Sequence, residues 1–421
     1  MNLFQTQRRY IVRAALGVFA AIYFKNALAD PLAGGEALSS SVQAATPIDR
    51  TKLLTAQLRL GHNLIDRLAR TSHRRINFVV SPASVTTILA LLDLGASDDM
   101  RNALHRTLGF SNASKKTTAD DFMGIRSTIS SLSKKTNDGG PLALANMIVF
   151  DPSTKPFQLA LLGLAAAGAD VSVEDLNKPE AVGRINDWIK KRTGGLIPAV
   201  LDEAPDDLGL VAINALYFKD RWKTPFDPTE TRLQPFNTGN GKPIDVPMMH
   251  LPEAKYAFRQ NAKFVGVKLS YAADDYKLVV ITTNVGTARV SAFAPVVSWL
   301  GGEDFALKAG EVAIPKFSSS ETTELLESLD SLGLSFARKN PRSFSALSPG
   351  ALMLSRILQK TELHVNEDGT EAAAATAVTA TRSFSPQSEY VKMVVDKPFV
   401  FALRDERTGL ILLMGYVGRP D

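Results

Sequence analysis

The side chains that most often carry enzyme chemistry are scarce in this chain of 421 residues. It has no cysteine, which excludes a disulfide, a thiol nucleophile and a cysteine-bound metal. The histidines do not stand at metal-ligand spacing, and we expect each to be a surface or capping residue: His62, His73, His105, His250 and His364. The sequence therefore indicates a protein with no metal site and no cofactor.

One short stretch matches a catalytic motif. Ser131 and Lys134 have the Ser-x-x-Lys spacing of penicillin-recognising hydrolases, but the Ser-Asp-Asn companion motif is missing. The stretch is rich in Ser, Lys, Thr and Asn and precedes Gly139–Gly140, so we expect a loop with a solvated lysine, which is a poor base. An exported Ser-x-x-Lys hydrolase is a remote alternative, and the sequence favours a protein that is not an enzyme.

Residues 366–383 form an unusual stretch of small and β-branched side chains. A surface helix would suit its four consecutive alanines and a flexible linker its composition, but neither explains the β-branched residues that follow. With the two-residue period of a strand, Glu371 lies on one face and the other face is uncharged: Thr370, Ala372, Ala374, Thr376, Val378 and Ala380. Such a segment can enter a sheet between two existing strands, a known mode of recognition and switching.

The same stretch resembles the hinge of inhibitory serpins. The similar residues are Glu367, Asp368, Gly369, Thr370, Glu371, Ala372, Ala373, Ala374, Ala375 and Thr376, which we call the hinge. Further similarities follow in the family order over nearly all of residues 51–421, at 78–84 (FVVSPAS), 142–146 (LALAN), 211–222 (VAINALYFKDRW), 246–249 (VPMM), 314–317 (IPKF), 397–399 (KPF) and 414–415 (MG). The resemblance implies an α+β serpin fold with three β-sheets, about nine helices and an exposed reactive-centre loop at about 367–390.

The resemblance also implies which residues govern loop insertion. The runs 208–218 and 353–365 would be neighbouring strands that part to admit the loop. Beneath them would lie a buried group that we call the shutter, with Ser81, Ser84 and Asn214 among its members.

Three further residues complete this implied machinery. Glu367 would pair with Lys316 at the top of the sheet, where Trp222 also belongs, and so stabilise the closed form. Gln359 stands in the shutter where the family often has a histidine, and it keeps a hydrogen-bonding group but cannot titrate.

In an inhibitory serpin a target protease attacks the loop, and the cut loop inserts while still bound to the enzyme. The family spacing counted from Glu367 puts Ser383 on the acyl side of the cut and Phe384 beyond it. We favour Arg382–Ser383, because a trypsin-like pocket binds arginine through a charge pair. A cut after Ser383 would indicate an elastase- or subtilisin-like target, and Phe384 leaves a chymotrypsin-like target open. A non-inhibitory serpin acting as carrier, chaperone or substrate is the alternative, which the uncharged run 372–377 disfavours.

The surrounding sequence indicates one mixed α+β domain, residues 48–421. Ser81–Pro82 is a helix N-cap followed by proline at the first helical position, and the helix behind it, Ala83 to Leu94, is apolar almost all round. Leu208–Phe218 is too continuously apolar for an exposed strand and should be central. Further helices are predicted at 53–68, after 97–99, at 179–192 and at 321–332, and further strands at 142–150, 276–283, 311–317, 399–403 and 410–417.

The N-terminus is typical of an export signal. Residues 1–29 place basic residues before the apolar run 14–24 and end in Ala27-Leu28-Ala29, and residues 30–47 are a flexible segment.

The formal net charge of the chain is +5, but residues 1–29 hold four basic and no acidic residues, which leaves +1 from Asp30 onward. Basic residues are not interleaved with aromatic ones, so nucleic-acid binding is not supported. We expect an exported monomer, periplasmic or extracellular and without a stable membrane anchor, whose partner is a serine protease.

Overall fold

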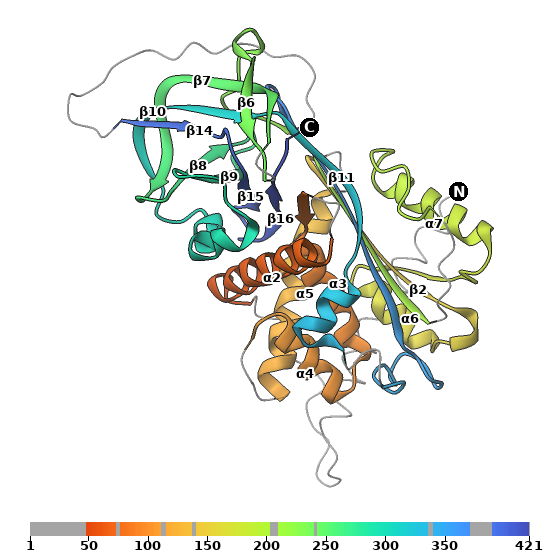
Figure 1. Ribbon diagram of the computed structural model, residues 1–421. Helices are drawn as coiled ribbons and strands as arrows, with labels where there is room; N and C mark the ends of the chain where they lie inside the picture. The colour runs from red at the N-terminus through yellow and green to blue at the C-terminus, as the bar shows by residue number, and fades with distance from the viewer. Residues whose placement is uncertain are drawn as a thin grey trace.

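The computed structural model describes residues 48–72, 76–110, 115–136, 140–202, 209–239, 242–335, 340–370 and 390–420 (Figure 1). The predicted export signal, the segment 30–47 and His73 lie outside these residues. None of the helices in the described ranges is long and apolar enough to cross a membrane.

The helices gather mainly beside and below one long sheet (Figure 1). The α-helices are α2 (Arg50–Thr71), α3 (Pro82–Leu92), α4 (Asp98–Thr107), α5 (Lys115–Thr136), α6 (Gln158–Ala166), α7 (Pro179–Arg192) and α8 (Leu326–Leu329). The other helical segments are the 3-10 helices η1 (Asp93–Gly95), η2 (Pro152–Thr154), η3 (Pro228–Glu230) and η4 (Val290–Gly301) and the π-helix η5 (Asp330–Leu334).

The strands form two hydrogen-bonded networks. The first has the order β3-β2-β4-β12-β13-β5, with β11 also paired to β12. Its strands are β2 (Leu142–Phe150), β3 (Asp170–Val173), β4 (Leu210–Phe218), β5 (Asp220–Arg221), β11 (Phe317–Glu324), β12 (Leu354–Val365) and β13 (Gly369–Thr370). The second has the order β1-β16-β15-β9-β8-β7-β10-β14, with β6 also paired to β7.

The second network is one hydrogen-bonded sheet of nine strands in two parts, so the described strands form two networks where the resemblance implied three sheets. Its strands are β1 (Asn77–Val80), β6 (Arg232–Asn237), β7 (Pro243–Gln260), β8 (Phe264–Ser270), β9 (Tyr276–Thr283), β10 (Ala306–Pro315), β14 (Val391–Val394), β15 (Phe399–Asp405) and β16 (Ile411–Val417). The 18 residues of β7 join the two parts, because the strand pairs with β6 over Pro243–Met248 and with β8 over Ala257–Gln260.

The first network separates two hydrophobic cores. All nine residues of β4 are buried, and alternate side chains such as Ala212 and Leu216 belong to the main core, which α3 shares. The side chains between them, such as Ile213 and Tyr217, belong to a smaller core that α7 covers (Figure 1). A strand buried on both faces explains the continuous apolar run in the sequence.

Most of the elements predicted from the sequence are present. The Ser81 side chain caps α3 by accepting the backbone N–H of Ser84, with Pro82 at the first helical position. The helix predicted at 321–332 is wrong over its first turn. Residues 317–324 form β11, whose eight residues pair one by one with β12, and helical structure begins only at Leu326. Cross-strand pairing overrides the local helical spacing there.

Candidate functional site

The candidate site is the junction between two parallel strands, β4 and β12, which we call the seam. β4 and β12 pair directly, from Leu210 with Leu354 to Tyr217 with Glu362, so no strand lies between them along this length. These are the two runs that the sequence analysis expected to part. In Figure 1 the seam follows the long diagonal of the molecule.

At the top of the seam two residues of the hinge already lie in the sheet. Gly369–Thr370 forms β13, in which Thr370 pairs with Val365 of β12 on one side and with Asp220 of β5 on the other. Gly369 is required here, because a Cβ atom would lie 2.1 Å from the Asp220 carbonyl oxygen, at a φ of +153°. β5 follows β4 in the chain, so β13 occupies the position where a new strand between β4 and β12 would begin.

Glu367 is bound at the same end of the sheet, as predicted. Its Oε1 lies 2.7 Å from Lys316 Nζ and accepts a hydrogen bond of 2.7 Å from Thr231 Oγ1. Burial alone would raise the pKa of Glu367, but the hydrogen bonds from Lys316 and Thr231 outweigh burial and hold the pKa below its usual value. The backbone carbonyl of Glu367 also accepts from Phe226 N at 2.9 Å. The ionised form is therefore the one that ties the hinge to β11 and to the segment before β6.

Trp222 supports the turn that leads into the hinge. Its indole Nε1 donates to the Asn366 carbonyl at 2.9 Å and its backbone N to the Asp368 carbonyl at 2.9 Å. The Trp222 ring stacks on Tyr271, with 4.4 Å between ring centroids and 18° between ring planes. The Asn366 side chain closes the turn by accepting the N–H groups of Asp368 and Gly369.

Two of the shutter residues, Asn214 and Gln359, lie in a buried polar row halfway along the seam. The strand register places Asn146, Asn214, Gln359 and Thr323 opposite one another on β2, β4, β12 and β11. All four side chains are buried. A buried row of this kind is costly unless its groups are hydrogen-bonded.

Gln359 connects this row to α3. Its Oε1 accepts the Ser81 N–H at 2.7 Å, and its Nε2 donates to the Ser81 carbonyl at 3.2 Å. Asn214 Nδ2 donates to Asn146 Oδ1 at 2.7 Å and to the Ala145 carbonyl at 3.2 Å. Asn214 Oδ1 and Ser84 Oγ are buried without a hydrogen-bond partner among the described residues. In the closed sheet these two buried polar atoms therefore lie without a protein partner in the described part of the chain, next to the junction of β4 and β12, where the sheet would open.

The structure brings together every predicted site residue that it describes. Glu367, Gly369, Thr370, Lys316 and Trp222 meet at the top of the sheet. Asn214 and Gln359 lie in the polar row, and Ser81 and Ser84 lie beside it at the start of α3, where Ser81 is hydrogen-bonded to Gln359. The rest of the predicted loop lies outside the described residues: Glu371, Ala372, Ala373, Ala374, Ala375, Thr376, Arg382, Ser383 and Phe384.

Five participants were not predicted from the sequence: Thr231, Tyr271, Asn146, Asn366 and Thr323. Asn146 falls in one of the quoted motifs, and Asn366 adjoins the hinge, so both were within reach of the sequence. Thr231 and Tyr271 come from segments distant in the chain, and no pattern in the sequence points to them.

The other residues that the sequence singled out for possible chemistry lie elsewhere in the structure. Ser131 and Lys134 belong to helix α5, not to a loop. His105 is a buried core residue, which corrects the expectation of a surface or capping role: its Nε2 lies 2.8 Å from Asp121 Oδ2, and its ring packs against Phe110. Among the residues that the structure describes, no group of three or more His, Asp or Glu side chains is placed to hold a metal ion.

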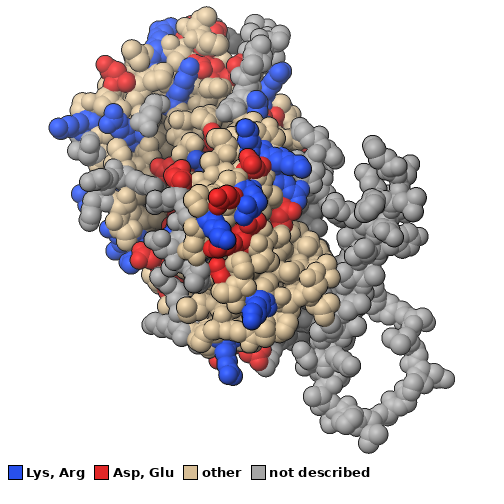
Figure 2. All heavy atoms as spheres, turned by 90° about the vertical axis from the view of Figure 1, so that its right-hand side faces the viewer, with Lys and Arg blue, Asp and Glu red and all other residues tan. Residues whose placement is uncertain are grey.

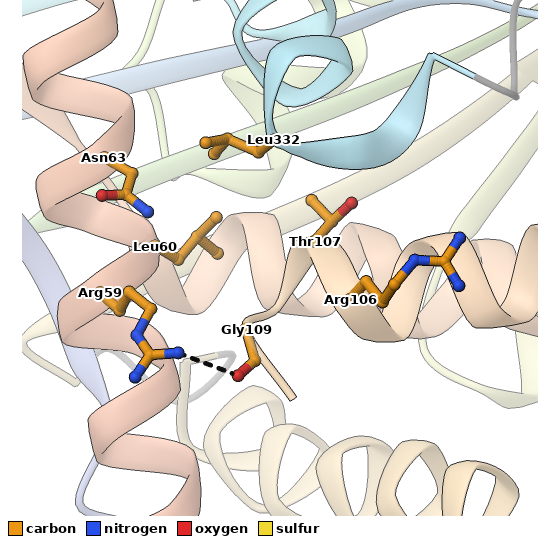
Figure 3. A pocket seen from close by; sticks show the side chains of 7 residues that line it. All are labelled: Arg59, Leu60, Asn63, Arg106, Thr107, Gly109 and Leu332. Carbon is orange, nitrogen blue, oxygen red and sulfur yellow. Dashed lines mark hydrogen bonds between the residues drawn. The ribbon is translucent and has the colours of Figure 1, made fainter. Parts of the chain in front are cut away.

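A separate hollow lies between α2 and α4, away from the seam (Figure 3). Its volume is about 210 Å³, and its lining residues are Arg59, Leu60, Asn63, Arg106, Thr107, Gly109 and Leu332. Arg59 Nη1 donates to the Gly109 carbonyl at 3.3 Å, while the Arg106 side chain points away from Arg59 (Figure 3). Two guanidinium groups that do not converge make no anion site.

Charges on the face that carries α7 are mixed in sign (Figure 2). Arg184 pairs with Glu174, Arg192 with Asp170 and Lys178 with Asp175. The basic residues of this face therefore do not form a patch of one sign.

Comparison with known proteins identifies this arrangement. A family model described as "Serpin (serine protease inhibitor)" matches residues 55–420. The chain belongs to the serpin family. Antithrombin-III of Mus musculus is 30% identical over 385 residues, which cover 88% of this chain and 82% of that protein. Plasminogen activator inhibitor 1 of Neovison vison is 27% identical over 414 residues, or 92% of this chain and 98% of that protein.

Solved structures show the same fold. Serpin48 of the insect Tenebrio molitor superposes with a TM-score of 0.76 at 24% identity, covering 89% of this serpin and all of that chain. Human thyroxine-binding globulin, solved with its hormone, gives a TM-score of 0.76 at 23% identity, covering 88% of this chain and 99% of that one. At this identity the structures establish the fold alone.

Proposed function

We propose that this serpin inhibits serine endopeptidases by presenting residues 371–389 as a substrate and inserting the cut loop between β4 and β12. The observation that carries the proposal is β13, whose two residues already occupy the head of that position, in register with both neighbouring strands. The protease supplies the nucleophile, and the serpin itself performs no catalysis.

The register of β13 specifies where each inserted residue would go. Thr370 pairs with Val365 in antiparallel register. If that register continued, residue 371 would pair with residue 364, residue 372 with residue 363, and so on along β12. Ala372 would then lie opposite Leu363, Ala374 opposite Thr361 and Thr376 opposite Gln359. These β12 residues face the main core, so the uncharged face of the hinge would be buried.

Insertion in this register would also give the buried polar row a further hydrogen-bonding group. Thr376 would enter between Gln359 and Asn214, with its hydroxyl beside the unpaired Asn214 Oδ1. Glu371 would meet His364, on the opposite face of the sheet from the core. Pairing of buried polar groups and new ladder hydrogen bonds would both favour the inserted state.

The reactive bond is proposed to be Arg382–Ser383, with a trypsin-like target. The test is incubation with trypsin, an elastase and a subtilisin, followed by denaturing electrophoresis and mass measurement of the released C-terminal peptide. A covalent complex with trypsin and a peptide that begins at Ser383 are expected. Arg382→Ala should abolish trapping by trypsin, and Ser383→Ala should keep it. Plain cleavage of the loop by every protease, with no complex, would contradict the proposal.

We further propose that residues 1–29 direct export and are removed, leaving a nearly neutral protein in the periplasm or medium. N-terminal sequencing of the exported protein tests this, with Asp30 as the expected first residue.

A further inference from the structure

Tyr271 brings a hydroxyl group from the second strand network to the head of the seam. It follows β8 and forms an isolated bridge with Trp222. Its side chain is fully buried, stacked on Trp222 and packed edge-on against Phe218, with ring centroids 4.9 Å apart. Two neighbouring rings, one from β4 and one from just after β5, therefore fix the direction in which the hydroxyl points.

The hydroxyl points at the hinge. Tyr271 Oη and Thr370 Oγ1 lie 2.8 Å apart, and both side chains are buried. Burial raises the pKa of Tyr271 far above its ordinary value, and this outweighs the hydrogen bond with Thr370. The phenol therefore stays neutral at physiological pH and can donate its proton. Losing either hydroxyl would leave the other buried without this partner.

Thr370 is thus held from three directions. Its backbone pairs with β12 on one side and β5 on the other, and its side chain bonds to Tyr271. The two strand pairings involve only two hinge residues, so the side-chain bond is a substantial part of what keeps this short strand in place.

We propose that Tyr271 is a positioning residue for loop insertion: its hydroxyl holds Thr370 at the head of the seam and sets the register in which the loop enters. The inference rests on the proposed inhibitory function. Once the acyl-enzyme has formed, insertion competes with hydrolysis of the acyl bond. A hinge whose Thr370 is already paired can begin insertion at once. An unpaired hinge must first find the correct register, so insertion starts later and a larger share of the acyl-enzyme is hydrolysed, which releases active protease.

The test compares two tyrosines that share a neighbour. Tyr271→Phe keeps the ring and removes the hydroxyl. Tyr276→Phe is the matched control, because the Tyr276 ring also packs on Phe218, at 5.0 Å, but its hydroxyl accepts from Arg407. The number of serpin molecules cleaved without trapping, per protease trapped, should rise about threefold to tenfold in Tyr271→Phe, the effect of one buried hydrogen bond on the rate of insertion, and should not change in Tyr276→Phe.

A second readout does not depend on a protease. Amide hydrogen exchange of the peptide spanning residues 366–370, in the intact protein, should become faster in Tyr271→Phe and stay at the wild-type rate in Tyr276→Phe. Thr370→Val removes the other end of the same bond, so it should reproduce both effects, and the double variant should be no worse than either single one.

The outcomes separate the two proposals. If the wild type and both variants trap protease equally and exchange is unchanged, Tyr271 has no positioning role, while the inhibitory function stands. If the wild type traps no protease, the inhibitory function fails, and exchange alone decides whether Tyr271 holds the hinge. Faster exchange in both Tyr271→Phe and Thr370→Val supports that role, and unchanged exchange overturns it.

Discussion

Gln359 and Ser81 are joined by a pair of hydrogen bonds, in which the Gln359 side chain accepts the Ser81 N–H and donates to the Ser81 carbonyl. This pair connects β12 to the first turn of α3 beneath the seam. A strand that entered between β4 and β12 would have to move past it, so the pair is part of what keeps the sheet closed.

Gln359→Ala should weaken the closed form. The substitution leaves the Ser81 N–H buried without this partner, whereas the Ser81 carbonyl still accepts from Val85 N, so the cost is roughly 1–3 kcal/mol in the free energy of unfolding. Urea unfolding measures the change. Gln158→Ala, at an exposed position at the start of α6, is the control and should stay within about 0.5 kcal/mol of the wild type. Equal unfolding midpoints for the two variants would contradict this role of Gln359.

The ion pair of Glu367 with Lys316 should make stability depend on acidic pH. The folded-state pKa of Glu367 lies below its ordinary value of 4.5, so its contribution is present above that value and is lost as the pH falls through the folded pKa. Lys316→Gln should remove about 0.5–1 kcal/mol near neutral pH and little at strongly acidic pH.

Urea unfolding at several pH values tests the ion pair. Lys392→Gln is the control, because Lys392 pairs with Glu311 where both side chains are exposed. The same loss from Lys316→Gln at every pH would show that the lysine acts through packing rather than charge.

Thr370→Arg should convert the inhibitor into a plain substrate. Thr370 is fully buried, and an arginine there would have to bury its charge. Trypsin should cleave the variant without forming a covalent complex. Glu371→Arg is the matched control, because the proposed register places residue 371 opposite His364, whose side chain is 35% exposed, so this variant should still trap trypsin. Trapping by Thr370→Arg would show that the two faces have been assigned the wrong way round.

Gly369→Ala and Gly183→Ala should have opposite effects on stability. At Gly369 a Cβ atom would collide with the Asp220 carbonyl oxygen, whereas at Gly183 in α7 it would meet nothing within 4 Å. We expect Gly369→Ala to lower the melting temperature and to release the hinge. Gly183→Ala should stabilise the protein by about 0.5–1 kcal/mol through helix propensity. A Gly369→Ala variant as stable as the wild type would argue against the close pairing of β13 with β5.

The sequence predicted the elements whose signals are local. The cap at Ser81, the apolar run of β4 and the helix 179–192 all appear where their patterns indicated. The predicted helix was wrong at residues 321–324, where four cross-strand pairs with β12, the last of the eight that β11 makes, overrode a helical spacing.

Contacts between distant segments could not be predicted in the same way. Tyr271 and Thr231 reach the hinge from 99 and 136 residues away, and nothing about their immediate neighbours marks them. His105 was misjudged for the same reason, because Asp121, which pairs with its ring, comes from another helix. The family resemblance implied roles for Glu367, Lys316 and Gln359 and the pairing of the first two, and the structure adds Thr231 as a partner of Glu367 and Ser81 as the partner of Gln359.

The central claim is that the residues after Thr370 enter the sheet between β4 and β12 when the loop is cut. It is tested most directly by comparing the thermal unfolding of the intact protein with that of the protein cleaved once within residues 371–389. Insertion adds a complete strand and pairs the buried polar row, so the cleaved protein should melt at a markedly higher temperature. A cleaved protein that melts at the same temperature as the intact one, or below it, would contradict the account.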